Sequence, residues 1–181
     1  MSEMGSQSDA VLVRRILAGE VELYQVLVER YRLEFGRYAT AMLGGDVDDA
    51  ADAQQEAFIR AYRSLASCRE PEKFKAWLFR IVSNQCHNTR RGRRKHVRLD
   101  RVQDPPDEST QRQLEANEIG QAIQTALDDL TTEQREAFVL KHVEGYSYAE
   151  MAALLEVGED ALKMRVHRAR DELQRRLEGL R

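Results

Sequence analysis

Apolar residues recur every three or four positions along most of this 181-residue chain, and no segment shows the strict alternation of a half-buried strand. The pattern is clearest between Gly145 and Arg170. Ser147, followed three positions later by Glu150, has the spacing of a capping box, which predicts a helix ending near Leu155. The chain is therefore expected to be all-α.

A short turn and a second amphipathic helix follow. Residues 156–158 have the length and glycine content of the turn in a helix-turn-helix, and Gly158 can cap the next helix. At about 100° per residue, one sector of roughly 60° in that helix is apolar. This predicted buried stripe consists of Leu162, Val166, Ala169 and Leu173.

The opposite side of this helix carries groups that could meet base edges, with cations beside them for phosphates. Such a layout is typical of a DNA recognition helix, although a solvated surface helix fits it too. The outward residues are Met164, His167, Arg168 and Asp171, flanked by Lys163 and Arg165.

Similar periodicity predicts further helices, with Asp9 and Asp46 as first residues or caps and a second capping box at Thr131 and Gln134. The predicted ranges are 9–18, 20–43, 46–65, 72–91, 114–130 and 132–143. The predicted helix 46–65 has an apolar face made mostly of small side chains: Ala50, Ala53, Ala57, Phe58, Ala61 and Leu65. The fourth has a core side of Phe74, Trp77, Leu78, Ile81 and Val82.

Residues 100–110 contain Pro105-Pro106 and no apolar period, so they predict a linker. We expect a disordered N-terminus at 1–8, a first domain at 9–98, a flexible linker at 99–113 and a second domain at 114–181. The fold class is thus two small helical domains, the second a helix-turn-helix of winged-helix-like four-helix type.

Charge is divided unevenly along the chain, whose net charge is −3. Residues 1–65 hold 7 basic and 11 acidic residues, residues 66–103 hold 11 and 3, and residues 104–181 hold 10 and 17. Seven of the twelve residues from Arg90 to Arg101 are basic, which favours phosphate binding over a solvated tail. A nucleic-acid-binding surface depends on such a local concentration of positive charge more than on the net charge of the whole chain.

Two polar helix faces are candidate interaction surfaces. The outer face of 46–65 is either a solubility feature or a dock for a basic partner; it carries Asp48, Asp49, Asp52, Gln55 and Glu56. Helix 72–91 has a cationic face with aromatics nearby, which suits a strand with unstacked bases. That face carries Lys73, Lys75, Arg80, Asn84 and Gln85.

Other classes of site find little support in the sequence. No apolar run reaches the roughly 18 residues of a membrane span, and the N-terminus lacks a signal peptide's apolar segment, so a cytoplasmic protein is expected. Cys68 and Cys86-His87 give no disulfide framework and only a weak zinc pattern, which ordinary packing explains better. With no glycine-rich phosphate loop and no carboxylate–histidine set at metal spacing, we expect no catalysis, no metal and no cofactor.

Several motifs together resemble one family. They are Glu29-Arg30-Tyr31, the run Asp49-Ala50-x-Asp52-x-x-Gln55-Glu56-x-Phe58, Trp77-Leu78-x-x-Ile81-x-x-Asn84, LTTEQREAFVLKHVEGYSYAEMA and ALKMRVHRAR. Nearly the whole chain resembles an extracytoplasmic-function (ECF) sigma factor, the smallest type in the bacterial sigma-70 family. The first three motifs resemble region 2 of that family and the last two resemble region 4.

The resemblance implies binding to core RNA polymerase, through the β′ clamp and the β flap, and recognition of promoter DNA. The residues implied at the clamp are Asp49, Asp52, Gln55 and Glu56. Those implied at the minus-10 element are the 66–73 loop for a flipped base, Asn84 for the adjacent strand, and Lys73, Lys75, Arg80, Arg90, Arg91, Arg93 and Arg94. Those implied at the minus-35 element are Lys163, Met164, Arg165, His167 and Arg168. An anti-sigma factor is a further implied partner, without membrane insertion of this chain.

Three positions depart from the family's usual pattern. Glu156 stands where the turn glycine is common, Ala161 replaces a common threonine, and Met164 replaces a common serine. Met164 donates no hydrogen bond, so it could make only apolar contact, as with a thymine methyl. The alternative function is a stand-alone helix-turn-helix regulator in which residues 1–95 sense a signal or dimerise.

Overall fold

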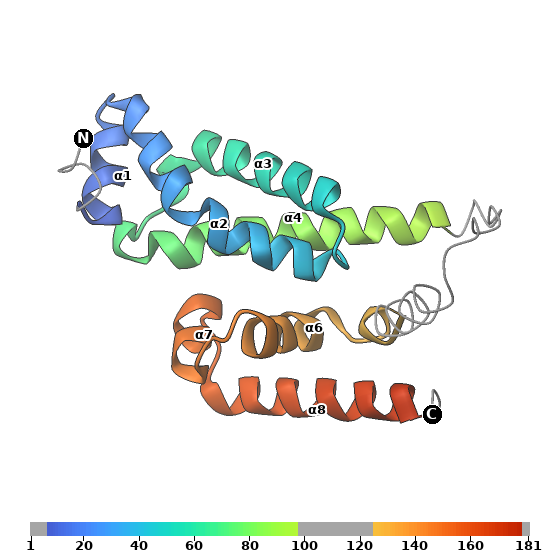
Figure 1. The fold of residues 1–181 in the computed structure, drawn as a ribbon. Helices are drawn as coiled ribbons and strands as arrows, with labels where there is room; N and C mark the ends of the chain where they lie inside the picture. The colour runs from blue at the N-terminus through green and yellow to red at the C-terminus, as the bar shows by residue number, and fades with distance from the viewer. Residues whose placement is uncertain (1–6, 98–124, 179–181) are drawn as a thin grey trace.

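The computed structural model describes residues 7–97 and 125–178, and every regular element in these ranges is helical. The elements form two bodies packed one against the other (Figure 1). The N-terminal body contains α1 (Asp9–Leu17), η2 (Val21–Leu23), α2 (Tyr24–Met42), α3 (Val47–Arg63), η3 (Leu65–Ser67), η4 (Pro71–Lys73) and α4 (Phe74–Val97). The C-terminal body contains α6 (Thr132–Phe138), η5 (Val139–Val143), α7 (Tyr148–Leu155) and α8 (Glu159–Leu177). The predicted fold class is confirmed.

The N-terminal body is organised around α3, whose buried face is made of small side chains. The inner face predicted from the sequence is buried throughout, and its alanines allow α2 and α4 to pack closely on either side. Aromatic rings fill the space between α2 and α4. Phe79 packs edge-on against Phe35 and Tyr38, with ring centroids 5.6 Å and 4.7 Å apart.

Helix ends in the N-terminal body differ from the sequence prediction. The cap of α1 is Ser8, whose Oγ accepts a hydrogen bond from the Val11 amide, whereas Asp9 binds Arg30 and Tyr31 on α2. The helix predicted at 20–43 begins with a 3-10 turn. Helix α4 extends six residues past the predicted end at Arg91. The first part of the basic run is therefore helical, as far as Val97.

The C-terminal body confirms both predicted capping boxes. Thr131 and Gln134 cap α6, and Ser147 and Glu150 cap α7. The last turn of the helix predicted at 132–143 is a π-helix, which periodicity did not indicate. The predicted linker 99–113 and residues 114–124 of the predicted helix 114–130 lie outside the described residues; residues 125–128 are helical.

The helix-turn-helix follows the prediction closely. Gly158 is the N-cap of α8, and Glu156 ends α7 in the left-handed region at φ 54°. The predicted stripe of Leu162, Val166, Ala169 and Leu173 is buried. On α7 the buried residues are Met151 and Leu154, whereas Tyr148, Ala152 and Leu155 are half-buried.

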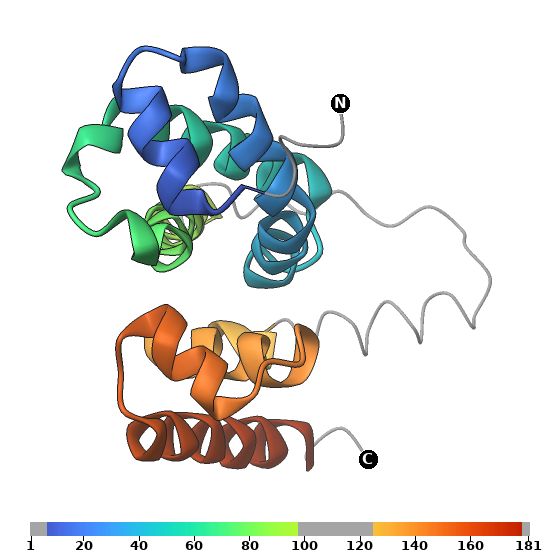
Figure 2. The same cartoon turned by 90° about the vertical axis from the view of Figure 1, so that its left-hand side faces the viewer.

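The two bodies share an apolar interface. Figure 2 shows α6 and α7 lying beneath α2 and α4. Contacts join α2 to η5 and α4 to α7, and buried residues from both bodies belong to one continuous cluster. No helix in ranges 7–97 and 125–178 is long and apolar enough to cross a membrane.

Candidate nucleic-acid and partner interfaces

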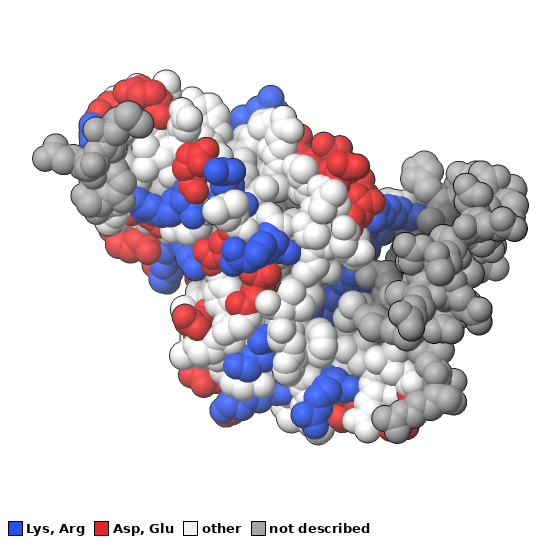
Figure 3. All heavy atoms as spheres, viewed as in Figure 1, with Lys and Arg blue, Asp and Glu red and all other residues white. Residues whose placement is uncertain are grey.

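The outer face of α3 is exposed and acidic. Asp52, Gln55 and Glu56 point away from the core, and acidic atoms gather over this helix in Figure 3. Asp49 is half-buried and forms an ion pair with Arg93 of α4, which also binds Asp46 and donates to the Leu43 carbonyl at 3.2 Å. The structure therefore joins one residue predicted for a protein partner to one predicted for DNA.

An apolar groove of about 490 Å³ lies beside this acidic face, between α2 and α3. Gln55 lines it, so the groove and the acidic face are continuous. Its other walls include Tyr24, Val28, Phe58, Ile59 and Tyr62. Sequence reasoning missed it, although Ile59 and Tyr62 are apolar residues outside the buried face of α3 and remain 37% and 42% exposed.

The predicted cationic face of α4 is only partly open. Arg91 and Asn84 are exposed, and Lys73 pairs with Glu70 at 2.7 Å in the adjoining loop. Lys75 pairs with Glu34 of α2 at 2.7 Å. Arg94 lies within α4, and its side chain is outside the description.

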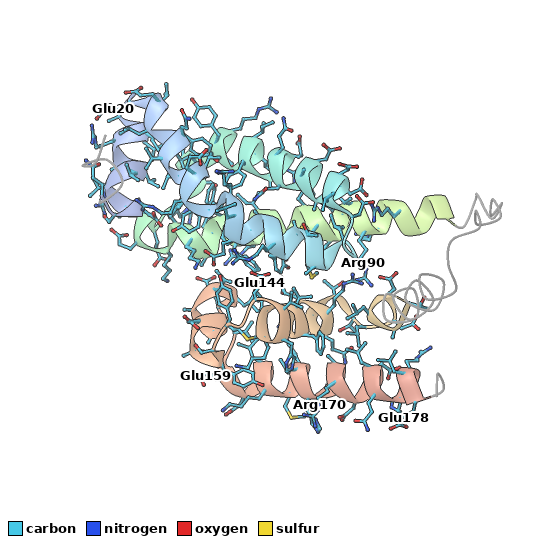
Figure 4. All side chains as sticks on the ribbon, viewed as in Figure 1. Glu20, Arg90, Glu144, Glu159, Arg170 and Glu178 are labelled. Carbon is cyan, nitrogen blue, oxygen red and sulfur yellow. The ribbon has the colours of Figure 1, made fainter. Side chains whose placement is uncertain are left out.

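Two of the predicted DNA-binding arginines of α4 contact the C-terminal body: Arg90 is buried there, whereas the Arg80 side chain remains 59% exposed. Arg80 forms an ion pair with Glu156 at the end of α7. Arg90 donates from Nη2 to the Asp128 carbonyl at 2.8 Å and from Nε to its carboxylate at 3.2 Å. Figure 4 shows Arg90 reaching from α4 toward the C-terminal body. The periodicity of α4 did not indicate these contacts, because they join residues far apart in the sequence.

The outward face of α8 has the predicted layout. Met164, His167 and Arg168 are exposed, Lys163 is exposed beside Asp160 at 3.0 Å, and Arg165 is half-buried. His167 Nδ1 lies 3.3 Å from the Asp171 carboxylate one turn later. Glu159 and Asp160 stand in the first turn, where the helix dipole favours negative charge. Basic atoms line this edge of the molecule in Figure 3.

Both cysteines are buried free thiols. Burial raises the pKa of the Cys68 thiol, and it raises the pKa of the Cys86 thiol to about 12. Within the part of the chain that the structure describes, no three His, Cys, Asp or Glu residues gather as a metal site would require.

Comparison with known proteins shows the family of this chain. Residues 27–96 match the sequence profile of Sigma-70 region 2, and residues 120–173 match that of Sigma-70, region 4. The ECF RNA polymerase sigma-E factor of Escherichia coli K12 is 30% identical over 186 residues, covering 96% of each chain. RNA polymerase sigma-H factor of Pseudomonas aeruginosa is 28% identical over 196 residues, again covering 96% of each.

Two solved structures are similar across most of the fold. CnrH in complex with the cytosolic domain of CnrY has a TM-score of 0.64 at 26% identity, covering 96% of this chain and 99% of that one. The sigma factor RpoE in complex with the anti-sigma factor NepR from Bartonella quintana has a TM-score of 0.53 at 27% identity, covering 86% and 98%. This chain belongs to the ECF sigma factors of the sigma-70 family, non-enzymatic initiation factors that bind RNA polymerase and direct promoter recognition through regions 2 and 4.

Proposed function

We propose that the outer face of α3 docks on the β′ clamp of core RNA polymerase. Asp49, Asp52, Gln55 and Glu56 supply the acidic and amide groups, and the adjoining groove supplies an apolar site for a side chain of the clamp. Support comes from the exposure of three of these four side chains and from Gln55 lining both surfaces. A charged rim beside an apolar pocket is a common arrangement at protein interfaces.

The minus-10 strand is proposed to follow α4 and the loop before it. The 66–73 loop would hold a flipped base and Asn84 would contact the adjacent nucleotide. Cations at Lys73, Lys75 and Arg80, and the cluster of Arg90, Arg91, Arg93 and Arg94, would serve the phosphates. Support comes from the position of all these groups on α4 or its N-terminal loop, with Asn84 and Arg91 exposed. A basic groove with neighbouring aromatics suits single strands.

The minus-35 element is proposed to be read by α8 in the major groove. Met164, His167 and Arg168 would face base edges while Lys163 and Arg165 contact phosphates, and the C-terminal body would also meet the β flap. Support comes from the exposure of the first three residues opposite a fully apolar stripe. Met164, 49% exposed, fits a thymine methyl.

Regulation by an anti-sigma factor is also proposed. Support comes from two similar structures, one solved with the cytosolic domain of CnrY and the other with the anti-sigma factor NepR. The proposed place of action is the cytoplasm, where the polymerase works.

The observation that carries the docking proposal is the exposed acidic and amide face of α3 beside the groove. Asp52→Lys with Glu56→Lys should weaken core polymerase binding at least tenfold, about 1.4 kcal/mol, and leave the circular dichroism spectrum unchanged. The matched control, Glu133→Lys with Glu178→Lys, makes the same charge change at exposed sites of the C-terminal body. Normal holoenzyme formation by the α3 variant would refute the docking assignment.

A further inference from the structure

The outward face of α8 contains a histidine that lies next to a carboxylate. His167 Nδ1 is 3.3 Å from the Asp171 carboxylate, and the two side chains are 59% and 45% exposed. Residues four positions apart on a helix are neighbours on its surface, so the helix itself brings this pair together. A carboxylate on a surface that meets DNA phosphates weakens binding. The place of Asp171 beside the imidazole therefore calls for a physical reason.

The position of α8 leaves this pair accessible. Figures 1 and 2 show α8 on the side of the C-terminal body that is turned away from α2 and α4. Met164, His167 and Arg168 are exposed on its outward face, opposite the buried stripe. An imidazole in this position can reach the edge of a base pair in the major groove.

The other acidic groups of α8 have different surroundings. Asp160 pairs with Lys163 at 3.0 Å in the first turn, where the helix dipole favours negative charge. Glu172 pairs with arginines of the last turn. Asp171 instead approaches an imidazole, a side chain whose two nitrogens exchange the roles of donor and acceptor when its proton moves. A carboxylate in this place acts on the hydrogen-bonding character of its neighbour.

The nitrogen that carries the proton decides what an imidazole can recognise. A neutral imidazole donates from one nitrogen and accepts at the other. An ionised carboxylate only accepts, so Asp171 favours the proton on Nδ1 of His167 and leaves Nε2 as an acceptor. Carboxylates fix the tautomer of metal-binding histidines in the same way.

An acceptor in the major groove distinguishes the two strands of a base pair. Adenine presents its N6 amino group there and cytosine its N4 amino group, whereas guanine and thymine present acceptor atoms. Nε2 of His167 would therefore gain a hydrogen bond from adenine or cytosine on the strand that it contacts. Against guanine or thymine it would meet a second acceptor and stay unpaired, which costs binding free energy.

We propose that Asp171 is a positioning residue for promoter recognition, which holds the proton on Nδ1 of His167 so that Nε2 accepts from the amino group of an adenine or cytosine in the minus-35 element. The inference rests on the proposed minus-35 role of α8 and names the class of base that one of its residues reads. Asp171 lowers the affinity for every DNA sequence, and it sharpens the choice of base at one position.

The first experiment measures base preferences in the complete holoenzyme. Full-length variants are combined with purified core polymerase at pH 8, where imidazoles are ordinarily neutral, and with a library of randomised promoter fragments. The bound fragments are then sequenced. His167→Ala should lose the preference at one position, which identifies the base pair that His167 reads. At that position the wild type should favour adenine and cytosine on one strand by about three- to tenfold.

Variants of Asp171 then test the positioning role. Asp171→Ala should relax the preference at the position identified by His167→Ala, because either nitrogen can then carry the proton, and should raise the affinity for all fragments. Asp171→Glu keeps a carboxylate one turn away and should keep the preference. The matched control, Asp160→Ala, removes an exposed carboxylate from the first turn of α8 and should change the affinity but no base preference.

A second experiment identifies the atom that is read. In a duplex of the preferred sequence, purine replaces adenine, or 2-pyrimidinone replaces cytosine, so that the exocyclic amino group is removed at this one position. Wild-type holoenzyme should bind this duplex about three- to tenfold more weakly than the parent duplex. The His167→Ala holoenzyme should bind the two duplexes equally, which controls for the weakened base pair.

The outcomes separate this inference from the proposed function. A preference that Asp171→Ala leaves unchanged, or an amino-deleted duplex that the wild type binds as well as the parent, would overturn the inference and leave the role of α8 intact. If His167→Ala altered no position of an enriched minus-35 element, the reading by His167 would fail together with the inference. A wild-type holoenzyme that enriches no minus-35 element would overturn both the inference and the role of α8.

Discussion

Replacing Glu156 by glycine should leave the protein more stable than replacing it by alanine, since both changes remove the same ion pair. Glu156 has φ 54° and ψ 42°, a left-handed conformation that costs a residue with a side chain about 1–2 kcal/mol. Glycine avoids this cost but loses about 0.5–1 kcal/mol more conformational entropy on folding. The ion pair with Arg80 is exposed on both sides, at 59% and 45%, and contributes at most about 1 kcal/mol.

Glu156→Ala separates the effect of the ion pair from that of the left-handed backbone. Alanine also loses the ion pair with Arg80, but it keeps the backbone strain. The Gly variant should therefore exceed the Ala variant by about 0.5–1 kcal/mol, or about 1–4 °C in thermal midpoint for a chain of this size. Circular dichroism at 222 nm monitors both bodies, while fluorescence of Trp77, the only tryptophan, monitors the N-terminal body. Equal midpoints for the two variants, or a lower one for glycine, would refute a left-handed residue at this position.

Three further perturbations test separate surfaces. Ile59→Asp places a charge in the apolar groove and should weaken core polymerase binding at least tenfold in a pull-down titration. Arg168→Ala should weaken minus-35 duplex binding about tenfold in a gel-shift assay while leaving minus-10 strand binding nearly unchanged. The Cys86 thiol, whose pKa burial raises to about 12, stays protonated at pH 8 and should react slowly with iodoacetamide until the chain unfolds.

Each of these variants has a matched control. Val11→Asp makes the Ile59 change at a similarly exposed site on α1, 41% exposed, and should leave polymerase binding intact. Arg175→Ala removes an exposed arginine from the last turn of α8. If it weakened minus-35 duplex binding as much as Arg168→Ala does, the outward face of α8 would not be the DNA-binding face. Thiol labelling uses Cys68→Ser, which leaves Cys86 as the single cysteine; fast labelling of the folded chain would contradict its burial.

Local features of this fold could be predicted because each depends on residues only a few positions apart in the sequence. The two capping boxes, the alanine face of α3 and the apolar stripe of α8 depend on spacings of three or four, which the helix converts directly into one face. The predicted cap of α1, Asp9, was wrong by one residue, because Ser8 and Asp9 can both accept an amide hydrogen bond. Here Asp9 is taken by Arg30 and Tyr31.

Features that join distant residues could not be predicted in this way. Periodicity gives the face on which Arg80 and Arg90 lie but not which residues of the C-terminal body they contact, so their pairing with Glu156 and Asp128 was missed. The groove beside Gln55 depends on how α2 crosses α3, which no local pattern states. The hydrogen bonds that Tyr38 and Ser83 donate to Glu136 likewise form only once the two bodies meet.

The most direct test of the whole account is run-off transcription with purified core polymerase on a library of randomised promoter fragments. The account predicts that the full-length chain forms a holoenzyme and yields transcripts from a subset of fragments sharing two separate sequence elements. Core polymerase alone should not select that subset. A chain that fails to bind core polymerase and instead binds duplex DNA by itself as a dimer would contradict the account and favour a stand-alone regulator.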